Sequence, residues 1–370
     1  MDGDYISDLP AELKEKILVE LPIKEVVRTS ILSSKWKDFW TSIPILTFRE
    51  GSTESKLTML VDKVLLVHQG SILKFKFDSE HPCTEAIGQW MLNLSRNGIR
   101  DLELRFSGGE RSKISSRLFS CLALERVDLS GCIINIPQDF QGFKLLRTLS
   151  LDNFDLTGIS INNVVSSCPL LERLKLVHFF HEGCLRILAP NLKHLAIFGD
   201  FLDLSLQTPK LVYACICLSG EEDYKKFNAT KAGEVSNITQ VLGCLHNIEE
   251  LNMGGSFIDF FDDDDDDDDG EDRPQGQTFW KSKATEDRLF KCLEIVNILY
   301  VQMTELSYRR DESMLEFAEL VLSTAPVLEK MNIIDYEDPT VYSTKVNCLP
   351  KLPKKVDIVF VKTSDDDEQY

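Results

Sequence analysis

The sequence lacks the motifs by which most enzymes are recognised. Its 370 residues contain no Walker loop, GxSxG turn, HExxH helix or CxxC pair. The ten cysteines lie mostly in apolar stretches, where a free thiol behaves as a small hydrophobic group, so we expect them to be reduced and structural. None has a basic neighbourhood that would activate it. The sequence therefore predicts a chain that is not an enzyme and that needs no cofactor.

Histidine is also scarce, and its few copies are scattered. Of the six, only His178 and His181 lie close together, three residues apart and beside Glu182. A structural zinc site needs four ligands at suitable spacings, and no third candidate follows these two. We expect both histidines to have structural or surface roles, with no metal bound.

No apolar run approaches the roughly 18 residues of a membrane-spanning helix. The first residues, MDGDYISDLP, are acidic where a secretion signal would be basic and then apolar. We therefore expect a protein of the cytoplasm, the nucleus or both, with no membrane partner.

Positive charge is in deficit, because 41 Lys and Arg face 60 Asp and Glu, a net charge of −19. Phosphate binding requires clustered cations, so nucleic acid is not an expected partner. Eight consecutive aspartates occupy 262–269, and a second acidic block ends the chain. Such a block repels itself and buries nothing, which predicts a disordered insertion over 259–279. An interaction segment for a basic partner is the open alternative.

The first 48 residues predict three short helices. Residues 6–22 carry apolar side chains at helical spacing and end at Pro22. A second helical stretch begins at Ile23 and a third near Ser33. So small a bundle is close to the lower limit for independent folding, so we expect surplus apolar surface on it to meet something else.

Four ordered motifs make this segment resemble the F-box of plant proteins. They are Leu9-Pro10, Ile17-Leu18 with Leu21-Pro22, Thr29-Ser30 with Leu32-Ser33, and Lys35-Trp36. The resemblance implies a Skp-type adaptor as partner and, through it, a cullin. It implies adaptor contacts at Leu9, Pro10, Leu13, Ile17, Leu18, Leu21, Leu32 and Trp36. The alternative is that these residues form only the core of a helical cap.

One pattern, apolar-x-x-apolar-x-apolar, recurs ten times along the rest of the chain. It begins at Ile72, Ile99, Leu124, Leu146, Leu171, Leu192, Leu211, Ile248, Leu293 and Leu328. The first six intervals, of 27, 25, 22, 25, 21 and 19 residues, fit leucine-rich repeats, and the longer later ones imply insertions. The fold class is therefore predicted as α/β, an irregular solenoid with a parallel sheet on its concave side and helices on its convex side.

A proline precedes the first apolar position by two residues in four repeats, at Pro169, Pro190, Pro209 and Pro326. Proline ends a helical segment and favours extended structure after it, as a strand start requires. Polar residues between the apolar positions should then lie on the open face of the sheet. The candidate target contacts are Glu103, Arg105, Arg126, Asp128, Lys175 and His194.

From about Arg288 the chain resembles the FBD region of plant F-box proteins, chiefly over Ser323 to Met331, with a helix predicted from Glu312 to Leu322. The predicted domains are an F-box (1–48), leucine-rich repeats (57–258), an acidic insertion (259–279), FBD-like terminal repeats (280–336), and a C-terminal strand with an acidic tail (337–370).

The resemblance implies a substrate-recognition subunit of an SCF-type ubiquitin ligase. Under this hypothesis the F-box binds the adaptor, and the open face of the repeat sheet binds a target protein that the sequence does not identify. Two alternatives stay open: an interaction scaffold that needs no adaptor, and an F-box receptor that senses a small ligand.

Overall fold

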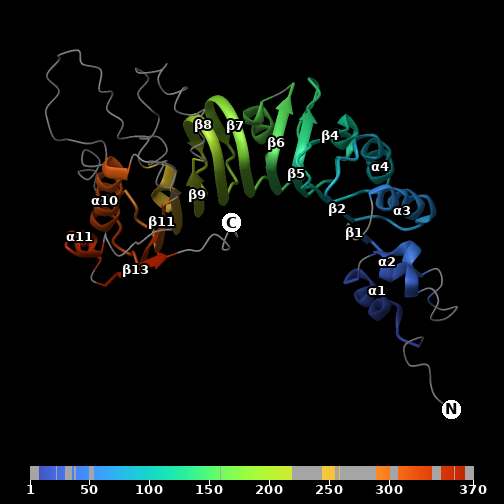
Figure 1. Cartoon of the computed structure of the whole chain (residues 1–370), viewed down its shortest axis with the longest axis horizontal. Coiled ribbons are helices and arrows are strands. Elements are labelled where there is room, and N and C mark those ends of the chain that lie inside the picture. Colours follow the sequence, from blue (N-terminus) through green and yellow to red (C-terminus); the bar gives the residue numbers. More distant parts are fainter. Residues whose placement is uncertain are drawn as a thin grey trace. The chain divides into compact units, whose positions relative to one another are not determined.

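The computed structural model describes residues 8–21, 23–29, 36, 39–49, 54–158, 160–218, 244–254, 258, 289–300, 307–335, 343–353 and 355–362. The chain divides into two compact units, Met1–Leu171 and Glu172–Tyr370. Both are built on parallel strands with helices between some of them (Figure 1). The predicted α/β class and the large parallel sheet are confirmed.

Six strands lie in the described residues of the first unit. They are β1 Ile45–Arg49, β2 Lys74–Ser79, β3 Asp101–Phe106, β4 Ser112–Ile114, β5 Arg126–Asn135 and β6 Thr148–Thr157. All pair in parallel in the order β1-β2-β3-β5-β6, and β4 pairs with β5. Parallel neighbours need crossover connections, which explains the helices between these strands.

The described helices of the first unit are α1 Ala11–Val19, α2 Ile23–Arg28, α3 Glu54–Val67, α4 Thr84–Arg96 and α5 Ile161–Ser166, with 3-10 turns η2 Phe39–Ser42 and η3 Ser116–Ser120. Trp90 of α4 packs on Phe75 and Phe77 of β2, with ring centroids 6.1 and 4.8 Å apart. α4 therefore covers one face of the sheet, and the residues that alternate with these phenylalanines point to the other face.

The described part of the second unit has seven strands, β7 Arg173–Leu188, β8 His194–Gln207, β9 Tyr213–Cys217, β10 Glu250–Gly254, β11 Ile295–Tyr300, β12 Lys330–Asp335 and β13 Asp357–Lys362. Each pairs in parallel with the next. Its described helices are α10 Ser307–Thr324, α11 Ser343–Asn347 and the 3-10 turn η4 Leu245–Asn247. α10 contains the helix predicted over 312–322.

The repeat pattern correctly locates ten strands, β2, β3 and β5 to β12. The three apolar positions of each repeat are buried, as at Leu102, Leu104 and Leu129. β1 and β4 were not predicted, because β1 directly follows the helical module and β4 has only three residues.

The four prolines occupy the same position in a tight turn. The turns are closed by N–H groups of Leu171, Leu192, Leu211 and Leu328, which donate to carbonyls three residues back at 3.1, 3.1, 3.1 and 3.4 Å. Each proline is then the second residue of its turn, where its fixed φ is favourable. Proline thus shapes the turn that leads directly into the strand.

Three strands of the middle repeats bend and continue, which the sequence did not predict. The bends lie at Gly131, Asn153 and His178, with φ of 67°, 46° and 48°. A Cβ at Gly131 would lie 2.0 Å from the carbonyl oxygen of Phe106, so only glycine fits there. Beyond the bends, the second segment of β5 pairs with that of β6, and the second segment of β7 pairs with β8.

Helices are not present behind every repeat. The apolar density of residues 161–168 and 235–245 predicts a short helix in each. α5 forms over the first segment, and the second lies mostly outside the described residues. Five residues (189–193) join β7 to β8 and five (208–212) join β8 to β9, so these repeats have only a turn between their strands. The concave and convex assignment stays a prediction.

In the N-terminal module, α1 and α2 match the first two predicted helices. The third falls mostly outside the described residues, which here include Trp36 and the turn η2. The acidic insertion at 259–279 also lies outside them. Within the described part of the chain, no helix is long and apolar enough to cross a membrane.

Candidate functional site

Helix α1 exposes apolar residues and buries a charged one. It begins after Pro10, whose carbonyl accepts the N–H groups of Leu13 and Lys14 at 3.1 Å each. Leu13 and Ile17 are 45% and 44% exposed, whereas Lys14 is 7% and Leu18 0% exposed. Residues four apart lie on one face of a helix, so Leu13 and Ile17 form one outward apolar surface. Leu18 is buried and Glu12, Glu15 and Lys16 are exposed as in an ordinary surface helix, so Leu13, Lys14 and Ile17 are the departure from that pattern.

The inward position of Lys14 has a local cause. Its Nζ lies 5.4 Å from the centroid of the Trp36 ring, a distance at which a cation is attracted to an indole face. Trp36 itself is 2% exposed. Lys14 and Trp36 therefore hold α1 in the orientation that leaves Leu13 and Ile17 outside.

The predicted adaptor contacts differ in their exposure to solvent. Pro10, Leu13 and Ile17 are exposed, Leu9 and Leu21 are half-buried, and Leu18 and Trp36 are buried. Leu32 lies outside the described residues. We call Pro10, Leu13 and Ile17 the α1 surface.

The module is joined closely to the first repeats. His68, after α3, contacts the carbonyl oxygen of Ile43 through Nε2 at 2.9 Å, and the N–H of Gln69 donates to Thr41 at 2.8 Å. A Cβ on Gly70 would come 2.7 Å from the carbonyl oxygen of Ser42. The turn η2 is therefore anchored against the end of α3.

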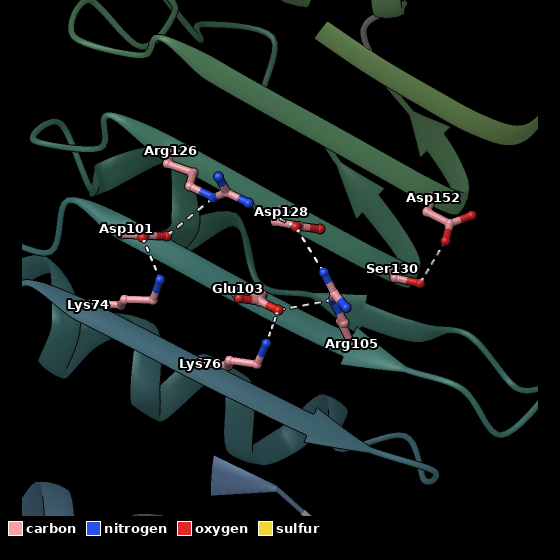
Figure 2. Close-up of polar contacts among 9 residues, drawn as sticks. All are labelled: Lys74, Lys76, Asp101, Glu103, Arg105, Arg126, Asp128, Ser130 and Asp152. Carbon is pink, nitrogen blue, oxygen red and sulfur yellow. Dashed lines mark hydrogen bonds and ion pairs between the residues drawn. The ribbon is translucent and has the colours of Figure 1, made fainter. Parts of the chain in front are cut away.

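A second candidate site is the sheet face that α4 leaves open. We call it the polar face. It carries the residue between the second and third apolar positions of each repeat, together with the residues two positions before and after it on the same strand. Register aligns Lys76, Glu103 and Asp128 across β2, β3 and β5. Figure 2 shows Glu103 between Lys76 and Arg105, with Arg105 reaching on to Asp128. Arg105 Nε lies 3.0 Å from Glu103 Oε1, and its terminal nitrogen lies 3.2 Å from Asp128 Oδ2.

Three further ion pairs extend this cluster along the sheet (Figure 2). Lys74 Nζ lies 2.9 Å from Asp101 Oδ2, and Arg126 lies 3.8 Å from Asp101 and 3.5 Å from Asp128. Both arginine side chains of the cluster are 47% exposed, whereas the carboxylates of Glu103 and Asp128 are 7% and 9% exposed. The predicted contact residues are thus brought together, with guanidinium groups outside and carboxylates beneath them.

The cations keep Glu103 ionised. Burial alone would raise the pKa of Glu103, but the hydrogen bond from Lys76 and the charges of Arg105, Lys76 and Lys74 lower it overall. The cluster therefore persists as paired charges at neutral pH.

On β10, β11 and β12 of the second unit the same position of the repeat carries an amide. Asn332 donates to Asn297 at 2.6 Å, Asn297 donates to Asn252, and Asn252 donates to the Tyr213 hydroxyl at 2.8 Å. The three asparagines face one another in register on β10, β11 and β12. The sequence contains a signal for this row of amide hydrogen bonds, because Asn stands between the second and third apolar positions in three repeats.

The other two predicted contacts lie on the polar face of the second unit. Lys175 on β7 and His194 on β8 are both half-buried. His194 Nδ1 is buried without a hydrogen-bond partner among the described residues, and its ring centroid lies 6.1 Å from that of Tyr213. Burial, together with the charges of Arg173 and Lys193, lowers the pKa of His194, so its ring is neutral at physiological pH.

His178 and His181, which stand close in sequence, have different contacts: the His178 ring lies 5.4 Å from that of Phe198. His181 Nε2 contacts the carbonyl oxygen of Cys184 at 3.3 Å. Among the described residues, no group of three His, Cys, Asp or Glu side chains could hold a metal ion.

Comparison with known proteins places this arrangement in a family. A family model described as the F-box domain matches residues 6–48, and one described as FBD-associated F-box protein At5g56370, LRR repeats, matches 87–262. The F-box/LRR-repeat protein At3g26922 of Arabidopsis thaliana is 32% identical over 214 residues, which cover 54% of this chain and 69% of that protein. The chain belongs to the plant F-box/LRR-repeat family.

Other F-box/LRR-repeat relatives carry the FBD name as well. The F-box/FBD/LRR-repeat protein At1g13570 of Arabidopsis thaliana is 38% identical over 259 residues, 67% of this chain and 61% of that protein. At3g52680, of the same description and organism, is 35% identical over 281 residues, 68% of this chain and 60% of that protein. The chain thus spans about three fifths of the length of these two relatives. Proteins of this family are typically non-catalytic, and F-box domains typically bind Skp-type adaptors.

Proposed function

We propose that this F-box/LRR-repeat protein is the substrate-recognition subunit of an SCF-type ubiquitin ligase. The α1 surface binds a Skp-type adaptor, which links the chain to a cullin, and the polar face binds the target protein. A partner enzyme transfers ubiquitin to a lysine of the target. This chain contributes binding energy and proximity to that reaction, and no chemical step of its own.

The observation that carries the proposal is the outward apolar pair of α1, Leu13 and Ile17, in a helix whose Lys14 is buried. Neighbouring exposed apolar side chains on so small a module support a binding surface, because a complex would remove them from water. Covering the remaining exposed area of Leu13 and Ile17 would stabilise a complex by about 1 kcal/mol for each residue. Both lie in the segment that the F-box model matches.

Binding of the purified chain to a purified Skp-type adaptor tests the α1 surface. The double variant Leu13→Ser, Ile17→Ser should bind about 30-fold more weakly, since about 2 kcal/mol of apolar burial is lost. Neither residue is in the core, so the helical content should stay unchanged.

The matched control is Leu66→Ser, because Leu66 of α3 is an exposed leucine at 83% outside the α1 surface. It should bind the adaptor as the unchanged chain does. Equal weakening by both sets of substitutions, or unchanged binding by the double variant, would overturn the proposed adaptor site.

Target binding is proposed for the polar face because it gathers half-exposed guanidinium groups over buried carboxylates. Fixed charges held by a rigid sheet select partners by complementary charge. Arg105 and Arg126 offer the exposed hydrogen-bond donors of this cluster.

Two alternatives predict different results. If the chain is a scaffold that works without an adaptor, changing Leu9 and Pro10 together to Ala leaves its interactions intact. A ligand-sensing receptor would need a cavity at the polar face. One cavity of about 860 Å³ lies away from that face, between α3 and α4, where Trp90 donates to Asp62 at 2.8 Å.

A further inference from the structure

Helices α3 and α4 of the first unit lie side by side, with the cavity of about 860 Å³ between them (Figure 1). Two hydrogen bonds join the helices along its floor. The indole N–H of Trp90 donates to Asp62 Oδ1 at 2.8 Å, and the Asn93 amide donates to the carbonyl oxygen of Leu65 at 3.5 Å. Trp90 and Leu65 are 1% and 6% exposed, so they close the floor. We call this cavity the α3–α4 groove.

The α3 side of the groove carries exposed apolar side chains. Leu66 lines the groove and is 83% exposed, more than any other large apolar residue in the described part of the chain. Met59, seven residues earlier, is 51% exposed, and residues seven apart lie on one side of a helix. Asp62 stands between them in the sequence. This side of α3 therefore presents an apolar, an acidic and an apolar side chain over two helical turns.

The charged side chains that line the groove are both acidic. They are Asp62 of α3 and Glu85 in the first turn of α4. Neither carboxylate forms an ion pair with another described residue, whereas Glu103 and Asp128 on the polar face are held by arginines. The hydrogen bond from Trp90 occupies Oδ1 of Asp62 and holds its side chain at the groove. The second oxygen of Asp62 is therefore left to accept from a cation outside the chain.

We propose that the α3–α4 groove is a docking site for a basic, amphipathic helix of a partner protein. Two helices side by side form a groove into which a third can pack a ridge of side chains. The partner helix places two apolar side chains, seven residues apart, on Met59 and Leu66. A lysine or arginine between them donates to Asp62. Met59 and Leu66 are about 10 Å apart along α3, which matches two turns of the partner helix.

Charge complementarity selects this occupant. An acidic helix would bring like charges to Asp62 and Glu85. A wholly apolar helix would remove both carboxylates from water without a charged partner. A basic helix with apolar neighbours instead covers Leu66 and pairs the carboxylates.

Binding of synthetic peptides to the full chain, followed by fluorescence anisotropy, tests the proposal. The probe is a labelled alanine-based helix of about 14 residues, with two leucines seven positions apart and two lysines between them. A second peptide has glutamate in place of both lysines. The lysine peptide should bind with a Kd of about 0.1 mM, and the glutamate peptide about tenfold more weakly. Equal binding of the two peptides, or no binding of the lysine peptide at about 1 mM, would overturn the proposal.

Substitutions in the groove locate the binding. Asp62→Asn removes the charge but keeps an oxygen for the Trp90 N–H, so the lysine peptide should bind about fivefold more weakly to a chain that still folds. Leu66→Ser should weaken binding about tenfold through lost apolar contact. The matched control is Glu110→Gln, which changes an exposed carboxylate in a loop of the same unit and should leave binding unchanged. Equal effects of Asp62→Asn and Glu110→Gln would contradict the assigned contact.

Two other occupants predict different results. A peptide that keeps the lysines but has alanine in place of both leucines, and binds as tightly as the probe, would assign the groove to a small cation. A dimer of the unchanged chain in sedimentation, lost in Leu66→Ser, would assign it to a second copy of this chain. Either result would overturn the partner helix.

The groove shares no residue with the α1 surface or the polar face, so this inference does not rest on the proposed function. The peptide experiment contains neither adaptor nor target. The double variant Leu13→Ser, Ile17→Ser should bind the lysine peptide as the unchanged chain does. Failure of the peptide to bind would leave the proposed function standing, and loss of peptide binding in this double variant would contradict a separate groove.

Discussion

The polar faces of the two units occupy equivalent positions of the repeat but differ in chemistry. In the first unit, Glu103 and Asp128 are held by cations on neighbouring strands, whereas in the second unit Asn252, Asn297 and Asn332 hold one another through amides. One scaffold therefore supports either a charged cluster or a neutral hydrogen-bond chain. The charged cluster should respond to salt and pH, and the amide chain should respond to neither.

The largest loss of stability is expected at Asn297, which lies at the centre of the row of hydrogen-bonded asparagines. Asn297→Ala would leave Asn252 Oδ1 and the Asn332 amide without their partners and should destabilise the second unit by about 2 kcal/mol. Hydrogen exchange of peptides from β10 to β12, with urea unfolding of the whole chain, measures the loss. Asn347→Ala, in exposed α11, is the matched control and should change neither. A loss of stability no larger than that of the control would show that the three amides do not stabilise one another.

An intermediate effect is expected at Glu103. Glu103→Gln should lower stability at pH 7 by about 1–2 kcal/mol, because Lys76 and Arg105 lose a common charged partner. The pKa of Glu103 is lowered in the folded state, so its stabilisation is complete above the unfolded pKa of about 4.3 and is lost as the pH falls through the lower folded value. Urea midpoints of both forms should therefore converge only in acid. Convergence at neutral pH would contradict the paired state.

The smallest effect is expected at the half-exposed Arg126. Arg126→Gln should cost about 0.5 kcal/mol at low salt and nothing measurable in about 1 M salt, where exposed charges are screened. Asn297→Ala should keep its full effect in the same salt. Urea unfolding at both salt concentrations measures this contrast, and an amide effect that also vanishes in salt would erase the distinction between the two faces.

The strands could be predicted because each repeat must bury three apolar residues at fixed spacing, so Leu102 and Leu104 mark β3 without knowledge of the fold. The bends within β6 and β7 could not be predicted, because a single residue with positive φ, such as Asn153 or His178, leaves no periodic pattern in the sequence. The turn prolines were found, but their position within the turn needed the hydrogen bonds of Leu171 and its equivalents.

The sequence could indicate which residues belong to the candidate sites, but not how their side chains pack against one another. The alternation of the repeat predicts Glu103 and Asp128 on the face opposite the leucines, whereas the burial of their side chains beneath arginines depends on cross-strand register, which one sequence does not specify. For α1, helical spacing selected Leu13, Ile17 and Leu18 together. Only the packing of Lys14 on Trp36 separates the outward pair from the buried residue.

The central claim is that two separate surfaces bind two different partners. Affinity capture from plant cells, with quantitative mass spectrometry, should compare the unchanged chain with Leu13→Ser, Ile17→Ser and with Arg105→Gln, Arg126→Gln. The account predicts that the α1 variant loses adaptor and cullin but keeps the target, and that the polar-face variant loses the target but keeps adaptor and cullin. Loss of both partners from either variant, or retention of adaptor by the α1 variant, would contradict it.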